Sequence, residues 1–341
     1  LWCRHQVGAF AAAIGAGAYV LSPYVLFATY ARASFAELTA LALAPWALWA
    51  RARAHELGAR GWALSALCFG LTLLAHPITG AIVLVAAALC AALGDASHRR
   101  RLATLMSAVI ALGLGAVLWL PAWLERDAVG DAHTLSPGLD YRGTFVPIDA
   151  LFSDPNLRLS AAYAPVSLGL AALAIVVALR NRQRAIIAIG SVAMVLTCAA
   201  LELARPAWDL IAPIARDVQF PHRLLGPGSL LLAGLAAIGM QALLRAPPRI
   251  SGTKPRWATR GTTALLVIGA FVGVSIHALA LRSVARLPPL PRLDLEFVIA
   301  KERQSGFRGM GYQGEFLPRG VESLGAAWRA VPAPQERLVR E

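Results

Sequence analysis

The sequence predicts an all-α integral membrane protein, and three observations support this. The chain of 341 residues is 57% hydrophobic and only 15% charged, and its mean hydropathy is +0.60. Its apolar residues form long runs, several of which reach the roughly 18 residues needed to cross a bilayer core. Its basic residues lie in short clusters between these runs. Because lipid offers backbone amides no hydrogen-bond partners, each run is expected to form a helix.

About nine transmembrane helices account for the apolar runs. They are expected over residues 8–30, 33–50, 61–75, 78–94, 102–121, 161–179, 185–204, 224–244 and 261–281. The third and fourth divide one apolar stretch, 61–94, which is too long for a single span. We place the division at His76-Pro77, because proline breaks a helix.

The distribution of charge predicts the orientation of the chain. Fifteen arginine and lysine residues lie at junctions on one side of the expected helices, against seven in the longer loops on the other side. The positive-inside rule makes the first side cytoplasmic and the large loops external. The net charge of +13 is therefore explained by topology, and we expect no nucleic-acid partner.

Two domains are expected. Residues 1–282 form the polytopic transmembrane domain, and residues 283–341 begin an external soluble segment with a proline-rich start at 287–291. The chain opens at Leu1 without a signal-like region, and both of its ends are expected to be truncated.

The chain contains no GxxxxGK(S/T), no GxGxxG after a strand, no HExxH and no GxSxG motif. The four cysteines, Cys3, Cys68, Cys90 and Cys198, do not have the spacing of metal ligands. We therefore expect packed thiols and no metal or other firm cofactor.

Ionisable residues at the external interface are the candidates for function, because such residues are costly near lipid unless they are paired or functional. Arg32 and Glu37 flank the turn after the first helix, where they form either a structural ion pair or a lipid-phosphate site with Glu37 as a base. His76 is either a plain turn residue or a contact for an anionic head group. Arg223 is either a snorkelling anchor or a donor to phosphate oxygens. Asp127, in the first large loop, is a second weak candidate for a catalytic acid or base.

Five stretches in order resemble a family of large bacterial membrane proteins, those with the membrane domain related to 6-pyruvoyl-tetrahydropterin synthase. Residues 21–24 and 30–37, read as LSPY and YARASFAE, resemble the family's "APY…YVRGALAE". LLAHPIT at 73–79 resembles "LLSHNIT", and QFPHR at 219–223 resembles "QFPWR". LWLPAWLER at 118–126 and GEFLPR at 314–319 complete the set.

This resemblance implies a many-helix architecture like that of the GT-C glycosyltransferases, in the bacterial inner membrane. Such enzymes take a sugar from a polyprenyl-phosphate carrier, which would be the co-substrate here, for cell-envelope glycan or glycoprotein synthesis. The lipid bilayer and the lipid-linked sugar donor are then the expected partners. A non-catalytic membrane scaffold and a flippase for lipid-linked material remain the alternatives. Despite the family's name, nothing in the sequence resembles the zinc site of a soluble pterin synthase.

The chain departs from the family pattern at three places. Ala28 stands where the family has Asp, Pro77 where it has Asn, and His222 where it has Trp. The family's earlier helix and long first external loop, where a GT-C catalytic acid would lie, have no counterpart before Leu1. From these differences we expect a fragment that lacks the catalytic acid, with Arg32, His76 and Arg223 as its lipid-phosphate ligands and Glu37 orienting Arg32.

Overall fold

The computed structural model describes residues 7–30, 32, 34–95, 97–125, 141–147, 165–212, 218 and 220–245. Within these ranges the chain is almost entirely helical, and its one β-type pairing is an isolated bridge between Val146 and Leu201. The all-α prediction is therefore confirmed. The expected helix at 261–281, the domain boundary at 282 and Asp127 lie outside the described residues.

Helices occur at eight of the nine positions that the sequence predicts. The α-helices are α1 Ala9–Val20, α2 Pro23–Tyr30, α3 Phe35–Leu57, α4 Ala59–Ala75, α5 Pro77–Gly94, α6 His98–Leu124, α9 Pro165–Arg180, α10 Arg184–Ala199, α11 Arg205–Leu210 and α13 Leu225–Arg245. Three 3-10 turns join them, η4 Tyr141–Gly143, η5 Glu202–Ala204 and η6 Pro221–Leu224.

Three helical segments in the described ranges are long and apolar enough to cross a membrane. They are Pro77–Gly94, His98–Leu124 and Pro221–Arg245, and the pair α1–α2 makes a fourth if it is taken as one bent span. Helices α4, α9 and α10 are apolar but shorter, at 17, 16 and 16 residues. The described part of the chain is thus a membrane protein with three to four candidate spans, fewer than the sequence predicts for the whole chain.

The single helix expected over 8–30 is in fact two helices that meet at an angle of 46°. The break falls at Leu21-Ser22, directly before Pro23, whose ring nitrogen has no hydrogen to donate to the preceding turn. The bend brings α2 against α3 and α13. Tyr24 on α2 is consequently buried between them.

The predicted division at His76-Pro77 is present. His76 has extended backbone angles (φ −155°, ψ 104°), as the residue before a proline prefers, and Pro77 opens α5 at a position that needs no amide hydrogen. The His76 ring also caps α5, since its Nδ1 accepts a hydrogen bond of 3.1 Å from the Thr79 amide. Histidine is not among the usual capping residues, so the sequence did not indicate this role.

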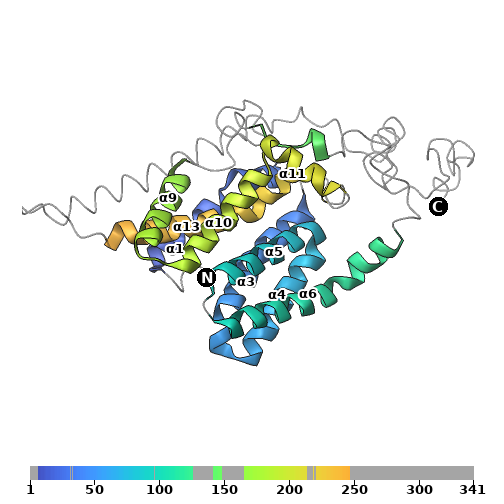
Figure 1. Ribbon diagram of the computed structural model, residues 1–341, viewed down its shortest axis with the longest axis horizontal. Coiled ribbons are helices and arrows are strands. Elements are labelled where there is room, and N and C mark those ends of the chain that lie inside the picture. The colour runs from blue at the N-terminus through green and yellow to red at the C-terminus, as the bar shows by residue number, and fades with distance from the viewer. Residues whose placement is uncertain are drawn as a thin grey trace, which may run out of the picture.

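The helices form two groups that meet along α5 (Figure 1). One group contains α3, α4, α5 and α6, and the other contains α1, α9, α10 and α13. Helix α5 packs against α10 and α13, which joins the groups. Helix α6 lies at the outside of its group and exposes large apolar side chains such as Val109, Val117 and Leu124. In a membrane this face contacts lipid.

The bundle has two chemically different ends. One end, here called the arginine end, carries the α3–α4, α5–α6 and α9–α10 junctions, with Arg51 bonded to Asp95 at 2.7 Å and Gly94 against Ala185. The other end carries the α2–α3 turn, the α4–α5 turn and η6. Most of the predicted site residues belong to this second end. That the arginine end is cytoplasmic stays a prediction.

Replacing Gly80 with alanine is expected to destabilise the α4–α5 hairpin. A Cβ at Gly80 would lie 2.6 Å from the Leu73 Cα, and overpacking of this kind costs about 1–3 kcal/mol. Gly113→Ala in α6 is the matched control, because a Cβ there meets nothing within 4 Å. Thermal unfolding in detergent measures both variants, and equal unfolding midpoints would contradict the close approach of α4 and α5.

Candidate functional site

A fully buried carboxylate lies at the centre of the candidate site. Glu37, in the first turn of α3, has 0% of its surface exposed. One carboxylate oxygen accepts a hydrogen bond of 2.5 Å from the Tyr24 hydroxyl. The other accepts a bond of 2.8 Å from Arg32 Nη1. Both oxygens of Glu37 are therefore occupied, and the Arg32 guanidinium is held in one orientation with 22% of its side chain exposed.

A glycine at the start of α13 permits this arrangement. A Cβ on Gly226 would lie 2.9 Å from the Tyr24 ring and 2.9 Å from Leu41 Cδ2. Only a residue without a side chain lets α13 approach α2 and α3 so closely. The packing thereby keeps the Tyr24 hydroxyl within reach of Glu37.

The second guanidinium of the site, that of Arg223, is buried and only partly satisfied. Arg223 lies in η6 and is 8% exposed. Its Nη1 donates to the Val218 carbonyl at 3.2 Å, and its guanidinium lies 4.6 Å from the centre of the Phe220 ring. Its Nε has no hydrogen-bond partner among the described residues. Arg32 lies 6.0 Å from the same ring, so Phe220 contacts both cations.

Two histidines complete the cluster. His76, Arg32, Glu37 and Arg223 lie close enough to interact electrostatically. His222 packs against Phe220 with ring centres 5.4 Å apart, and its Nδ1 is 3.4 Å from the Thr144 carbonyl oxygen. Since a carbonyl can only accept, a hydrogen bond here needs the proton on Nδ1, and in a neutral ring the lone pair is then on Nε2. That Nε2 is buried and has no partner in the part of the chain that the structure describes.

The described residues of the site carry more positive than negative charge. Arg32 and Arg223 are two cations, and Glu37 is the one carboxylate that interacts with both. A buried cation without a full partner is costly, because burial removes the water that would stabilise it. The arrangement thus favours an anion beside Arg223 and Arg32.

A second cluster ties the neighbouring 141–147 segment to α11. Tyr141 stacks on Trp208 with ring centres 6.0 Å apart, and its hydroxyl donates to Asp209 Oδ1 at 2.5 Å. Arg142 Nε donates to the same oxygen at 2.9 Å. Through Thr144 this segment also reaches His222. We call the cluster of Tyr141, Arg142, Trp208 and Asp209 the aromatic clasp.

The structure brings four of the five sequence-predicted site residues together. Arg32, Glu37, His76 and Arg223 form one cluster, whereas Asp127 lies outside the described residues. Their binding role stays a prediction. Tyr24 and Phe220 are site residues that were not predicted from the sequence, and His222 was noted there only as a departure from the family. All three belong to the quoted motifs at 21–24 and 218–223, so the motifs contained the signal.

The described residues contain no group of three or more histidine, cysteine, aspartate or glutamate side chains that could hold a metal ion. Among the described residues, the polar groups of the site are two guanidiniums, a carboxylate, a phenol and two imidazoles.

The fold and the site together define a multi-span helical membrane protein with a cationic cluster at one end of its bundle. A family model described as the 6-pyruvoyl-tetrahydropterin synthase related domain, a membrane protein domain, matches residues 1–242. The chain belongs to this family, as its motifs predicted. A search of curated proteins found no match to the chain.

Removing the Tyr24 hydroxyl tests the buried carboxylate cluster. Tyr24→Phe is expected to lower the free energy of unfolding by about 2 kcal/mol, because a charged acceptor loses its donor. Tyr19→Phe is the matched control, since its hydroxyl donates to the neutral Leu41 carbonyl at 2.8 Å and its loss costs about 1 kcal/mol. Denaturant unfolding compares the two. A Tyr24→Phe loss no larger than the Tyr19→Phe loss would contradict a charged cluster.

Acid is expected to open the aromatic clasp. Hydrogen bonds from Tyr141 and Arg142 lower the pKa of the Asp209 carboxyl below its ordinary value of 3.8. A lowered pKa stabilises the clasp above the ordinary value, and this stabilisation is lost as pH falls through the lowered pKa. The Trp208 signal, taken as the fluorescence difference from Trp208→Phe, should therefore change only below about pH 4. Persistence of the same acid transition in Asp209→Asn would show that another group causes it.

Proposed function

We propose that the chain is a GT-C-like membrane glycosyltransferase that binds the phosphate of a polyprenyl-phosphate sugar at the Arg32–Arg223 cluster, on the external face. The observation that carries the proposal is the incompletely paired guanidinium of Arg223, 8% exposed, with its Nε unsatisfied within the described chain. A phosphate oxygen is an acceptor of the right charge for that donor. The family membership supports a membrane-embedded role of this kind.

The two arginines suit the leaving group of such a transfer. In the proposed reaction an acceptor hydroxyl attacks the anomeric carbon, and the bond from that carbon to the phosphate oxygen breaks. The electron pair leaves with the polyprenyl phosphate, whose negative charge grows as the bond breaks. Preorganised cations at that point stabilise the transition state more than the ground state. Arg32, held by Glu37, and Arg223, held against Phe220, are preorganised in this sense.

Glu37 fits the role of a positioning residue better than that of a base. Both of its oxygens already accept hydrogen bonds, and it has no exposed surface. The proton of the acceptor hydroxyl needs another destination. The lone pair on His222 Nε2 is one candidate, and Asp127 remains the other.

A second candidate function is lipid-phosphate binding without sugar transfer. The Glu37 carboxylate favours it, because both of its oxygens already accept hydrogen bonds. Among the described residues, Glu37 is the site's one carboxylate, and it is fully engaged. A scaffold that holds a lipid phosphate would need the two arginines and no base. Assay of sugar release from the lipid carrier distinguishes this function from transfer, whereas phosphate binding is common to both.

Arg223→Gln is expected to weaken binding of polyprenyl phosphate to the purified chain in nanodiscs by about tenfold or more, because a charged hydrogen bond to phosphate is lost. The uncharged polyprenol, measured in parallel, should bind weakly to wild type and variant alike. Binding is followed by displacement of a fluorescent polyprenyl phosphate.

Arg205→Gln is the matched control, because Arg205 is an exposed cation at the same end of the bundle. If Arg223→Gln lowers the unfolding midpoint, Arg223→Lys keeps the charge while removing the planar fork and should still lose affinity. Unchanged polyprenyl-phosphate binding in a folded Arg223 variant would refute the assignment.

A further inference from the structure

A cavity of about 370 Å³ opens at the arginine end, far from the candidate site along α3. Its lining residues are Leu48, Arg51, Ala52, Glu56, Trp62, Ala87, Cys90, Asp95, Arg100, Thr104, Ala185, Ile189 and Leu231. They come from α3, α4, α5, α6, α10 and α13, so the cavity lies where the two helix groups meet. A volume of this size is in the range of small-molecule and headgroup sites.

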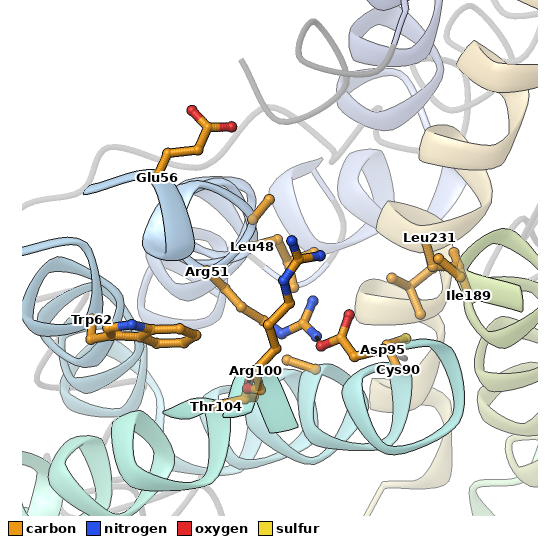
Figure 2. A pocket seen from close by; sticks show the side chains of 13 residues that line it. Leu48, Arg51, Glu56, Trp62, Cys90, Asp95, Arg100, Thr104, Ile189 and Leu231 are labelled. Carbon is orange, nitrogen blue, oxygen red and sulfur yellow. Dashed lines mark hydrogen bonds and ion pairs between the residues drawn. The ribbon is translucent and has the colours of Figure 1, made fainter. Parts of the chain in front are cut away.

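The cavity has a polar mouth and an apolar interior. Figure 2 shows the Arg51, Arg100 and Asp95 side chains gathered together, with Trp62 on one side and Leu231 and Ile189 on the other. Arg51 and Arg100 come from the last part of α3 and the first turn of α6, at the ends of their helices. Leu231 lies further inside the bundle, in the second turn of α13. A ligand that fits has a polar head and an apolar body.

The charges at the mouth do not balance. Arg51 Nη2 donates to Asp95 Oδ2 at 2.7 Å, which neutralises that pair. Glu56 points away from the gathered side chains in Figure 2 and pairs with Arg53 at 2.8 Å. Arg100 has no ion pair among the described residues. The mouth therefore has a surplus cation.

A buried donor also lacks an acceptor there. Arg51 Nε has no partner in the described part of the chain, although its side chain is only 17% exposed. Arg101 Nε donates to the Asp95 backbone carbonyl at 2.8 Å, which holds the α5–α6 junction in place. The α5–α6 junction is thus held beside two groups without a partner in the described residues. They are the Arg100 guanidinium, which has no ion pair, and Arg51 Nε, which has no acceptor.

We propose that this cavity binds the phosphate headgroup of an anionic phospholipid, with Arg51 and Arg100 contacting the phosphate and the apolar wall contacting the acyl region. A soluble phosphate ester would leave the apolar interior without a matching surface, whereas a phospholipid fills both parts. Helix α6, which carries Arg100 at the mouth, also exposes apolar side chains such as Leu102 and Leu105, so this part of the helix is accessible to bilayer lipid. Basic pockets between helix ends are suited to such headgroups, particularly in the leaflet that the arginine end is predicted to face.

The test uses the full chain in nanodiscs of neutral phosphatidylcholine with a few per cent of phosphatidylglycerol as the probe. Bound phosphatidylglycerol is counted after detergent extraction by native mass spectrometry. Arg100→Gln is expected to reduce the bound fraction about five- to tenfold, the effect of removing one cation near a lipid phosphate. Arg99→Gln is the matched control, because Arg99 is an exposed neighbour in the same helix turn and does not line the cavity.

Three results would overturn the proposal. Equal losses for Arg99→Gln and Arg100→Gln would indicate general surface charge, and no loss for Arg100→Gln would exclude the cavity as the site. Displacement of phosphatidylglycerol by millimolar inorganic phosphate would assign the cavity to a soluble phosphate instead. A selective loss with Arg100→Gln that inorganic phosphate does not reproduce supports a lipid site. The unfolding midpoint of both variants should match wild type, since neither arginine has an ion-pair partner in the described ranges.

Discussion

The buried carboxylate of Glu37 is the constraint on which the candidate site depends. An ionised carboxylate with no exposed surface is tolerable only if both of its oxygens are satisfied, and Tyr24 and Arg32 do this. The requirement explains several features of the surrounding fold. Pro23 breaks the first helix so that α2 meets α3, and Gly226 lets α13 approach without displacing the Tyr24 ring. As a consequence, the partly exposed guanidinium of Arg32 is held in one orientation at the end of the bundle.

The charged side chains are paired differently at the two ends of the bundle. Around Glu37, the described residues of the site offer one carboxylate to two guanidiniums that share the Phe220 ring, which leaves a buried cation incompletely paired. At the arginine end, Arg51 and Arg53 each form an ion pair, Arg51 Nε has no partner among the described residues, and the surplus cation is the exposed Arg100. The first arrangement is rigid and recessed, and the second opens on a cavity with an apolar wall. The two proposals thus place phosphate groups at two separate ends of the bundle.

Much of the fold followed from the sequence, because hydropathy and proline position act locally. The apolar runs predicted helices at eight positions that the structure describes, and His76-Pro77 correctly marked the α4–α5 turn. The break before Pro23 was missed, because the apolar run from residue 8 to 30 has the length of one span, although Pro23 is a local signal of the same kind as Pro77. The shorter α9 and α10 show why an apolar run does not by itself establish a full span.

The charged members of the site were predicted residue by residue, whereas the neutral ones lay within the quoted motifs and were not identified individually. Arg32, His76 and Arg223 stood out because ionisable residues near lipid are unusual. Tyr24 and Phe220 did not, because aromatic residues are common at membrane interfaces and their role here depends on tertiary packing. The same reason applies to the cap that His76 provides for α5 and to the lone pair of His222. The inner cavity was beyond sequence reasoning, since its walls come from six helices.

A structure of the full chain in a lipid bilayer with polyprenyl phosphate added would test the central claim most directly. We expect phosphate density within hydrogen-bond distance of Arg223 Nε and of the Arg32 guanidinium, with Glu37 still bound to Tyr24. An Arg223 guanidinium paired instead with a carboxylate of the chain, with no phosphate beside it, would rule out phosphate binding at this cluster.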